Sequence, residues 1–183
     1  MNRAEALFLL KENLRNVNLI KHSLAVEAVM KKLAQKFGED EDKWALAGLL
    51  HDIDYEETKN NPQEHSLKGA ALLEEKRLDS EVVKAVRAHN EIHNIPRETK
   101  MAQSLYCVDP LTGLIVAATL VLPDKKIASL TAENVLNRYK EKSFARGANR
   151  EVISACKELD LTLEEFAKIG LEAMQAINNE IGL

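Results

Sequence analysis

The chain has 183 residues, of which 45% are hydrophobic and 30% charged, while aromatic residues make up only 4%. This length allows one domain with a sizeable core that needs no disulfide bonds. The composition, with few glycines and prolines, argues against a disordered chain or a β-sandwich and favours a soluble, mostly helical protein. The formal net charge of -4 argues against a general nucleic-acid binder, although a local basic pocket stays open.

The helical spacing of apolar residues predicts a series of helices and no strand, so the expected fold class is all-α. The first two helices are expected at residues 2–14 and 19–37, the second ending at Gly38, which suits a left-handed cap. A third helix should start in the acidic cluster 39–42 and end at His51. Further helices are expected at residues 63–75, 79–89, 99–122, 132–142, 150–159 and 163–181, with Pro110 disturbing the third of this group.

The N-terminus and the cysteines indicate a cytoplasmic protein without membrane contact. Residues 1–16 are amphipathic and lack the apolar core and cleavage site of a signal peptide. The longest apolar run, Leu111 to Leu122, is too short to cross a membrane and is expected to be a buried helix. Cys107 and Cys156 are far apart in the sequence, and we expect both to be reduced packing residues.

One stretch, Gly48-Leu49-Leu50-His51-Asp52-Ile53-Asp54, places ionisable groups at the end of an apolar helix. Burying such groups is costly unless they are paired or bind a metal ion. His22, His65 and His89 also lie near ends of predicted helices, and Asp109 is a carboxylate within an apolar segment. Imidazole and carboxylate groups together bind Mn, Fe, Co, Ni or Zn. The set therefore predicts a site for a divalent transition metal between helix ends.

The order of these residues resembles the HD superfamily of metal-dependent phosphohydrolases and is similar to its HDIG-type subgroup. The resemblance extends over about residues 20–113, and its motifs are GLLHDID, EHSLKGA around His65, and AHN, which ends at Asn90. It implies a helical bundle of the HD type, with a single domain over residues 1–183. The core would lie at about residues 20–122, with C-terminal helices of segment 123–183 packed on it.

The resemblance also implies a set of metal ligands. One ion would bind His22, His51, Asp52 and Asp109, while Asp52 would bridge to a second ion held by His65 and His89. Some members of the superfamily have two adjacent histidines where this chain has His89 followed by Asn90. One ion is therefore expected, and a second stays open. His93, in the following loop, is either a further ligand or a surface or substrate-contacting residue.

Two acidic residues that follow Asp52 are candidates for the chemistry. A metal-activated water that attacks a phosphate ester requires a group that orients it or takes its proton. Asp52 as the bridging ligand and Asp54 and Glu56 as the nearest further carboxylates are the predicted catalytic residues. The alternative for Asp54 and Glu56 is that they are solvated acids of a loop.

Three basic residues are candidates for binding a phosphate group. Lys68 lies one helical turn after His65, and Arg146 and Arg150 lie in the basic segment 125–150. Arg146 and Arg150 would share a face if their segment were helical. A solvated charged surface is the alternative for each of them.

The leading functional prediction is a phosphohydrolase that acts on a small phosphorylated molecule, such as a nucleotide, and does not bind nucleic acids generally. The ligand order is also similar to that of a few di-iron oxygenases, which is the alternative enzyme. A third reading is a metal-bound sensing module without turnover. A homodimer stays open, because the apolar segment Leu111 to Leu122 could cover a partner as readily as the core.

Overall fold

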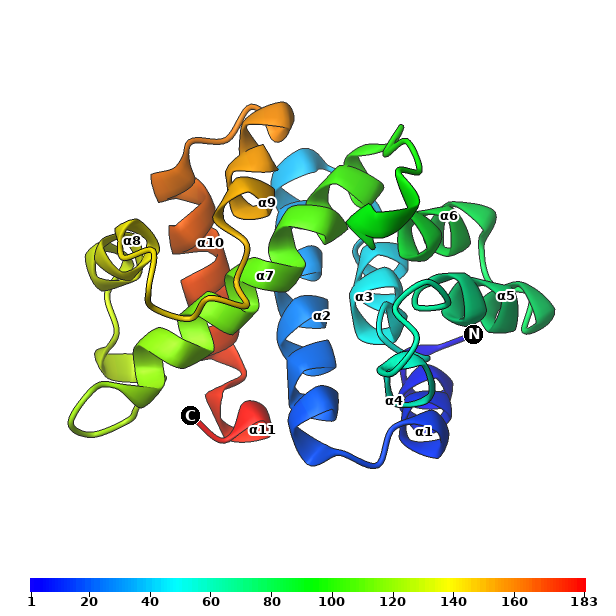
Figure 1. The fold of residues 1–183 in the computed structure, drawn as a ribbon, viewed down its shortest axis with the longest axis horizontal. Coiled ribbons are helices and arrows are strands. Elements are labelled where there is room, and N and C mark those ends of the chain that lie inside the picture. The colour runs from blue at the N-terminus through cyan, green and yellow to red at the C-terminus, as the bar shows by residue number, and fades with distance from the viewer.

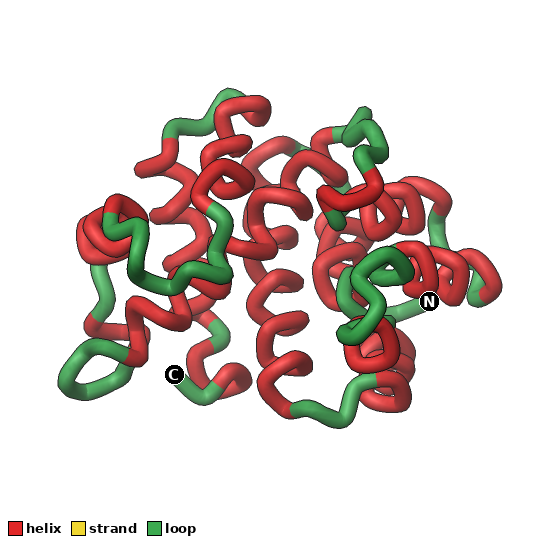
Figure 2. Tube along the Cα trace, viewed as in Figure 1, coloured by secondary structure: helices red, strands yellow, loops and turns green.

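The computed structural model describes all residues from Met1 to Leu183, and every regular element in it is helical (Figures 1 and 2). The prediction of an all-α fold is therefore confirmed. In chain order the helices are α1 (Arg3–Asn13), α2 (Val17–Phe37), α3 (Glu41–Leu50), α4 (Tyr55–Thr58), α5 (Leu67–Glu75), α6 (Ser80–Ala88), α7 (Lys100–Leu120), α8 (Ala132–Lys140), α9 (Arg150–Ser154), α10 (Leu163–Ala176) and α11 (Asn178–Ile181). Short 3-10 turns lie at Glu91–His93, Ile127–Ser129 and Ala155–Leu159.

Local capping explains why the helices next to the site start and stop where they do. Gly38 has a φ of 70° and ends α2 in the left-handed conformation, as its sequence position predicted. The Asp40 side chain then accepts a hydrogen bond from the backbone N–H of Lys43 and starts α3. Because the turn between α2 and α3 is so short, the two helices pack closely side by side.

A glycine allows α2 and α3 to approach each other. A Cβ atom on Gly48 would lie 2.8 Å from the backbone nitrogen of Glu27 and 2.8 Å from the carbonyl oxygen of Val26. No larger residue fits between these helices without moving α2. This close packing fixes the C-terminal end of α3, where His51 and Asp52 follow.

Helix α7 crosses in front of α2 and supplies much of the core (Figure 1). The expected disturbance at Pro110 is wrong, because α7 continues from Lys100 to Leu120. Proline removes one backbone donor, which leaves the carbonyl of Tyr106 without its helical partner. The following turns are held by Leu111, Leu114 and Ile115, which are all almost fully buried, and this packing keeps the helix continuous.

By length and composition α7 is also apolar enough to cross a membrane. The buried core helix of a protein can have the same length and composition, and 61% of the apolar 18-residue stretch of α7 is buried within the protein. The predicted buried helix over Leu111 to Leu122 is confirmed for most of its length. Its C-terminal end is not buried as expected, since Leu120 and Val121 are about half exposed.

Some predicted boundaries differ from the observed ones. The helix expected at residues 63–75 begins only at Leu67, because Ser66 has a φ of 71° and cannot continue a right-handed helix. Residues 163–181 form α10 and α11, which are separated at Ile177. Helix α10 packs on α2, α7 and α8, and Phe166 and Met174 join the same buried cluster as the residues of α2 and α7.

Candidate metal centre

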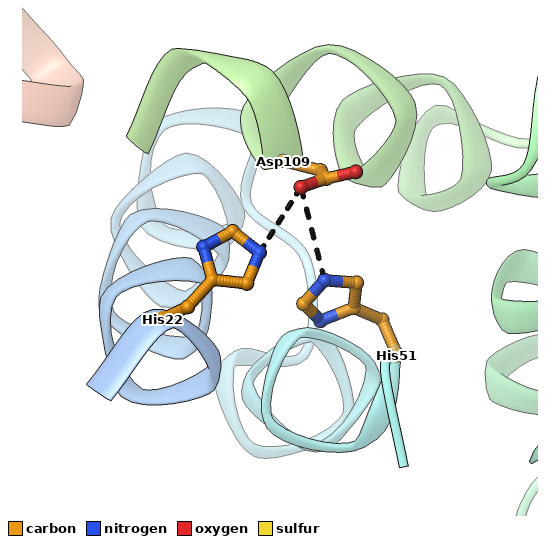
Figure 3. Close-up of side chains that lie close together, drawn as sticks. All are labelled: His22, His51 and Asp109. Carbon is orange, nitrogen blue, oxygen red and sulfur yellow. Dashed lines mark ion pairs between the residues drawn. The ribbon is translucent and has the colours of Figure 1, made fainter. Parts of the chain in front are cut away.

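The six predicted metal ligands come together from five parts of the fold. His22 lies in α2, His51 and Asp52 directly follow α3, and Asp109 lies in α7. His65 lies just before α5, and His89 ends α6. Figure 3 shows how the side chains of His22, His51 and Asp109 face one another from α2, the end of α3 and α7.

The first group of ligands surrounds one oxygen of Asp109. Its Oδ1 atom lies 3.0 Å from His22 Nε2 and 4.0 Å from His51 Nε2. Asp52 Oδ2 lies 3.8 Å from the same nitrogen of His22. His22, His51 and Asp109 could hold a metal ion, since one ligand atom from each lies within 4.8 Å of the others.

The second group surrounds the other oxygen of Asp52. Asp52 Oδ1 lies 3.3 Å from His65 Nε2, 3.4 Å from His89 Nε2 and 3.5 Å from His51 Nε2. The Nε2 atoms of His65 and His89 are 3.2 Å apart. Asp52 thus directs Oδ2 toward His22 and Oδ1 toward His65 and His89, as a bridging carboxylate requires. His51, Asp52 and His89 also have ligand atoms close enough to hold one ion, so His51 lies between the two groups.

All four histidines direct Nε2 inward because Nδ1 is occupied by a protein group. His51 Nδ1 lies 2.8 Å from the carbonyl oxygen of Gly48, and His89 Nδ1 lies 2.7 Å from that of Val86. His65 Nδ1 is 2.9 Å from Asp54 Oδ1. His22 Nδ1 is 3.2 Å from Thr112 Oγ1, whose hydroxyl donates to the carbonyl of Asp109 and so accepts from the imidazole. Metal-binding histidines are typically oriented in this way.

One buried atom tests directly whether these residues fit a metal ion. His51 is fully buried, and its Nε2 has no hydrogen-bond partner in the protein. Burial lowers the pKa of His51 to about 4, so the ring is neutral at pH 7 and Nε2 carries a lone pair. An unpaired buried acceptor costs about 1–3 kcal/mol. A metal ion would satisfy it, so the residues fit the ion that the sequence predicted.

The ionisable groups of the centre strongly shift one another's pKa values. Burial raises the pKa of Asp52, but the imidazoles of His51, His65 and His89 outweigh this effect and hold that pKa well below its usual value. Burial lowers the pKa of His65, but hydrogen bonds to Asp52 and Asp54 outweigh it and raise that pKa to about 10. The metal-free centre therefore carries ionised carboxylates and a protonated His65 at neutral pH.

Asp54 lies behind His65 and does not face the ion-binding groups. It is buried, Oδ1 lies next to His65 Nδ1, and Oδ2 accepts a hydrogen bond of 2.7 Å from the backbone N–H of Gly69. Both oxygens are thus occupied. The geometry places Asp54 as a residue that orients His65, in contrast to the water-orienting base expected from the sequence.

Glu56 and Lys68 lie outside the centre, which corrects both expectations. The carboxylate of Glu56 accepts hydrogen bonds from the backbone N–H groups of Arg15 and Asn16 and so holds the loop between α1 and α2. Lys68 is exposed and forms ion pairs of 2.7 Å with both Glu57 and Glu64. Neither side chain is available at the cluster.

Arg150 is also not free to bind phosphate. Its guanidinium donates to six backbone carbonyls, those of Arg138, Tyr139, Glu141, Phe144, Ala145 and Ala148. Residues 141–149 form no helix, so Arg146 and Arg150 do not share a helix face. Arg146 is exposed and lines a cavity with Lys140 and Lys142. The expectation for Arg150 is therefore wrong, whereas Arg146 stays a candidate.

Asn90 and His93 hold the backbone of His65. The Asn90 amide donates to the carbonyl of His65 at 3.2 Å, and His93 Nε2 lies 2.8 Å from the same oxygen. Asn90 also lines the cavity that contains His65, His89 and Asp109, while its amide donates to the carbonyls of Pro62 and His65. These interactions and the one from Thr112 were missed from the sequence, because no residue pattern distinguishes a side chain that supports a ligand from an ordinary polar one.

The centre opens to solvent through two cavities. One, of about 280 Å³, is lined by His22, Asp109, Pro110 and Gly113 and by Ala145, Gly147 and Ala148. The other, of about 210 Å³, is lined by His65, His89 and Asp109 together with Tyr106 and Asn149. Each group of ligands therefore has its own access for a substrate.

The fold is an all-helical bundle in which histidines and aspartates converge on one site. This combination places the chain in the class of helical proteins with a candidate histidine–aspartate metal centre. The model of the HD domain matches residues 19–116, more than half of the chain, and we conclude that the chain belongs to the HD domain family. Members of this family bind divalent metal ions. No solved structure gives a significant match.

Several curated relatives are named ribonuclease Y. The enzyme of Lawsonia intracellularis is 32% identical over 138 residues, which cover 74% of this chain and 26% of that protein. The one of Clostridium novyi is 30% identical over 169 residues, or 90% of this chain and 33% of that protein. The chain thus spans about a quarter to a third of the length of these relatives.

These relatives correct one prediction. A ribonuclease acts on RNA, and this contradicts the expectation of a small-molecule substrate without general nucleic-acid binding. The family and the relatives support the coarser prediction, that of a hydrolase. The net charge of the whole chain did not indicate a nucleic-acid substrate, because it averages over a strongly basic segment at residues 138–150.

Proposed function

We propose that the protein is a metal-dependent phosphodiesterase that hydrolyses RNA at the histidine–aspartate centre. The observation that carries this proposal is the convergence of four imidazole Nε2 atoms on Asp52 and Asp109, with every Nδ1 atom occupied and with His51 Nε2 unpartnered. The relatives named ribonuclease Y support RNA as the substrate.

Each ligand has a proposed role. His22, His51, Asp52 and Asp109 would hold one divalent transition metal ion, and Asp52 would bridge to a second one held by His65 and His89. When bound, such ions would polarise a phosphate oxygen and activate a water molecule. Mn, Fe, Co, Ni and Zn all accept this mixture of nitrogen and oxygen donors.

The surrounding residues hold the ligands in place. Asp54 fixes the ring of His65 through Nδ1, and Asn90 and His93 hold its backbone carbonyl. Thr112 holds His22 from α7, the helix that also carries Asp109. The result is a preorganised set of donors, which a phosphoryl transfer reaction needs more than it needs covalent chemistry from the protein.

The test is cleavage of a 5′-labelled single-stranded RNA by the purified protein with Mn²⁺, Co²⁺, Ni²⁺ or Zn²⁺ and with excess EDTA. We expect cleavage that depends on the added ion, that EDTA abolishes and that the variant Asp109→Ala loses by at least about a thousandfold. Asp42→Ala, which removes an aspartate in the first turn of α3, at the opposite end of that helix from His51, is the matched control. Metal-independent cleavage, or full activity in Asp109→Ala, would contradict the proposal. Bound iron with a mixed-valence signal and no cleavage would instead identify the oxygenase alternative.

A further inference from the structure

We propose that the cavity lined by Lys140, Lys142 and Arg146 binds phosphates of an RNA strand that flank the bond lying in the metal centre. This inference rests on the proposed function and adds a second binding site to it. The cavity has a volume of about 740 Å³ and lies between the end of α8 and the start of α9.

The cavity adjoins the metal centre. Glu91, Gly147 and Asn149 line it, and the same three residues line the smaller cavity that contains His65, His89 and Asp109. Gly147 also lines the cavity next to His22. A strand that leaves the metal centre past Gly147 therefore enters the cationic cavity directly.

The charge of this part of the chain is opposite to that of the whole. Residues 138–150 carry five cationic side chains and one acid, a formal charge of +4 in a chain of -4. The acid, Glu141, pairs with Arg138 at 2.9 Å. Lys140, Lys142 and Arg146 form no ion pair and no side-chain hydrogen bond. Three unpaired cations at the wall of one cavity are suited to bind the phosphates of a nucleic-acid backbone.

The loop that carries these cations is ordered by Arg150. The six carbonyls that accept from its guanidinium belong to residues between 138 and 148, so the loop wraps around one partly buried guanidinium. The cations project from this fixed loop rather than from a free tail. Because less conformational freedom is lost on binding, an ordered loop binds a strand more tightly than a disordered one with the same charges.

The cavity wall carries four cations, Lys140, Lys142, Arg146 and Arg150, and two acids, Glu91 and Glu151, so its formal charge is +2. The Glu91 carboxylate accepts hydrogen bonds from the hydroxyl of Tyr106 at 3.3 Å and from the amide of Asn149 at 3.4 Å. It therefore ties the loop to the turn after α6 at the junction of the two cavities. The cationic side chains lie farther along, where flanking phosphates would arrive.

The first arm of the test measures binding without cleavage. The dissociation constant of a fluorescent single-stranded RNA of about 12 nucleotides is measured by anisotropy, in EDTA and at several salt concentrations. We expect Lys140→Ala/Lys142→Ala/Arg146→Ala to raise the constant at least about tenfold. The slope of its logarithm against log[salt] should fall by about 0.7 for each phosphate group that the variant no longer binds. The control Lys84→Ala/Lys168→Ala removes two exposed cations that line none of these cavities.

The second arm compares cleavage of the same RNA with that of bis(p-nitrophenyl) phosphate, which has no flanking phosphate. We expect the ratio of kcat/KM for RNA to that for the small diester to fall about tenfold in the triple variant and to be unchanged in the control. Unchanged RNA affinity, salt slope and ratio would overturn the second site. If the wild-type protein cleaved neither substrate but the triple variant still bound RNA more weakly, the proposed function would fail while the phosphate-binding cavity would stand.

Discussion

At the scale of single residues, Asp54 has the most specific supporting role. It is the hydrogen-bond partner of His65 Nδ1 and also accepts from the backbone of Gly69. Removing a group that orients a metal ligand lowers metal affinity by about 10–100-fold. We expect Asp54→Ala to lower the affinity for Mn²⁺ by this factor in a calorimetric titration. The matched control Glu57→Ala removes an exposed acid and should leave the affinity unchanged, and equal affinities for all three proteins would contradict the role of Asp54.

The protonation of His65 predicts how metal binding depends on pH. Because its pKa is raised to about 10 in the metal-free protein, His65 is protonated at pH 7, whereas His51, with a pKa of about 4, is neutral. An ion that binds His65 must displace this proton, so its affinity should decrease as the pH falls below about 10. The same proton stabilises the metal-free fold below pH 6.5, and this contribution is lost as the pH rises through about 10.

The displaced proton can be measured directly. Calorimetric titration with Mn²⁺ at pH 7.5, in buffers with different ionisation enthalpies, should give an apparent enthalpy that depends on the buffer, with about one proton released per ion bound at His65. Burial lowers the pKa of His22, but its hydrogen bond to Asp109 outweighs this effect and raises that pKa, so an ion bound at His22 also displaces protons. The His65→Ala variant should therefore release about one proton fewer than the wild-type protein. An enthalpy independent of the buffer in the wild-type protein would show that no ion binds at His65.

At the scale of elements, the contact between α2 and α3 positions His51 and Asp52. A Cβ on Gly48 would meet backbone atoms of Val26 and Glu27 at 2.8 Å, and backbone cannot move aside as a side chain can. We expect Gly48→Ala to destabilise the protein by about 1–3 kcal/mol, as measured by denaturant unfolding. Gly113→Ala is the control, because its Cβ meets nothing within 4 Å in α7. It should be neutral or stabilise by up to about 1 kcal/mol. A Gly48→Ala protein as stable as the wild type would contradict the close packing.

The loop between α8 and α9 depends on the geometry of one guanidinium. Lysine in place of Arg150 keeps the charge but offers three donors for six carbonyls. We expect Arg150→Lys to increase the rate of chymotryptic cleavage at Phe144 by at least about tenfold, because each missing charged hydrogen bond costs about 1.5–3 kcal/mol. Arg146→Lys, whose side chain makes no hydrogen bond, should be cleaved like the wild type. Equal rates for both variants would show that Arg150 does not hold the loop.

At the scale of the whole molecule, the ligand set was predictable while its surroundings were not. His51, Asp52 and Asp109 stood out because ionisable residues in apolar segments are costly to bury, and the resemblance to the HD superfamily joined them with His22, His65 and His89 into one ligand set. The contacts of the Arg150 side chain could not be predicted, because they depend on the conformation of a loop whose sequence has no periodicity. Asp54 was misjudged for a similar reason: only the fold shows that His65 and Gly69 occupy both of its oxygens.

The error about nucleic acids also arose at this scale. A net charge of -4 describes the average surface, while the segment next to the metal centre carries +4. Binding responds to the local potential, which a cavity can concentrate. The distribution of charge along the chain, with five cations between residues 138 and 150, was therefore the more informative quantity.

We propose that Asp52 bridges two ion-binding groups, and crystals grown with Mn²⁺ should reveal the bound ions by anomalous diffraction. We expect an anomalous peak among His22, His51, Asp52 and Asp109. A second ion, where bound, should give a peak among Asp52, His65 and His89. Both should be absent from crystals of Asp52→Ala. No peak at Asp52 in the wild-type protein, or an unchanged peak in the variant, would show that Asp52 does not hold the ions.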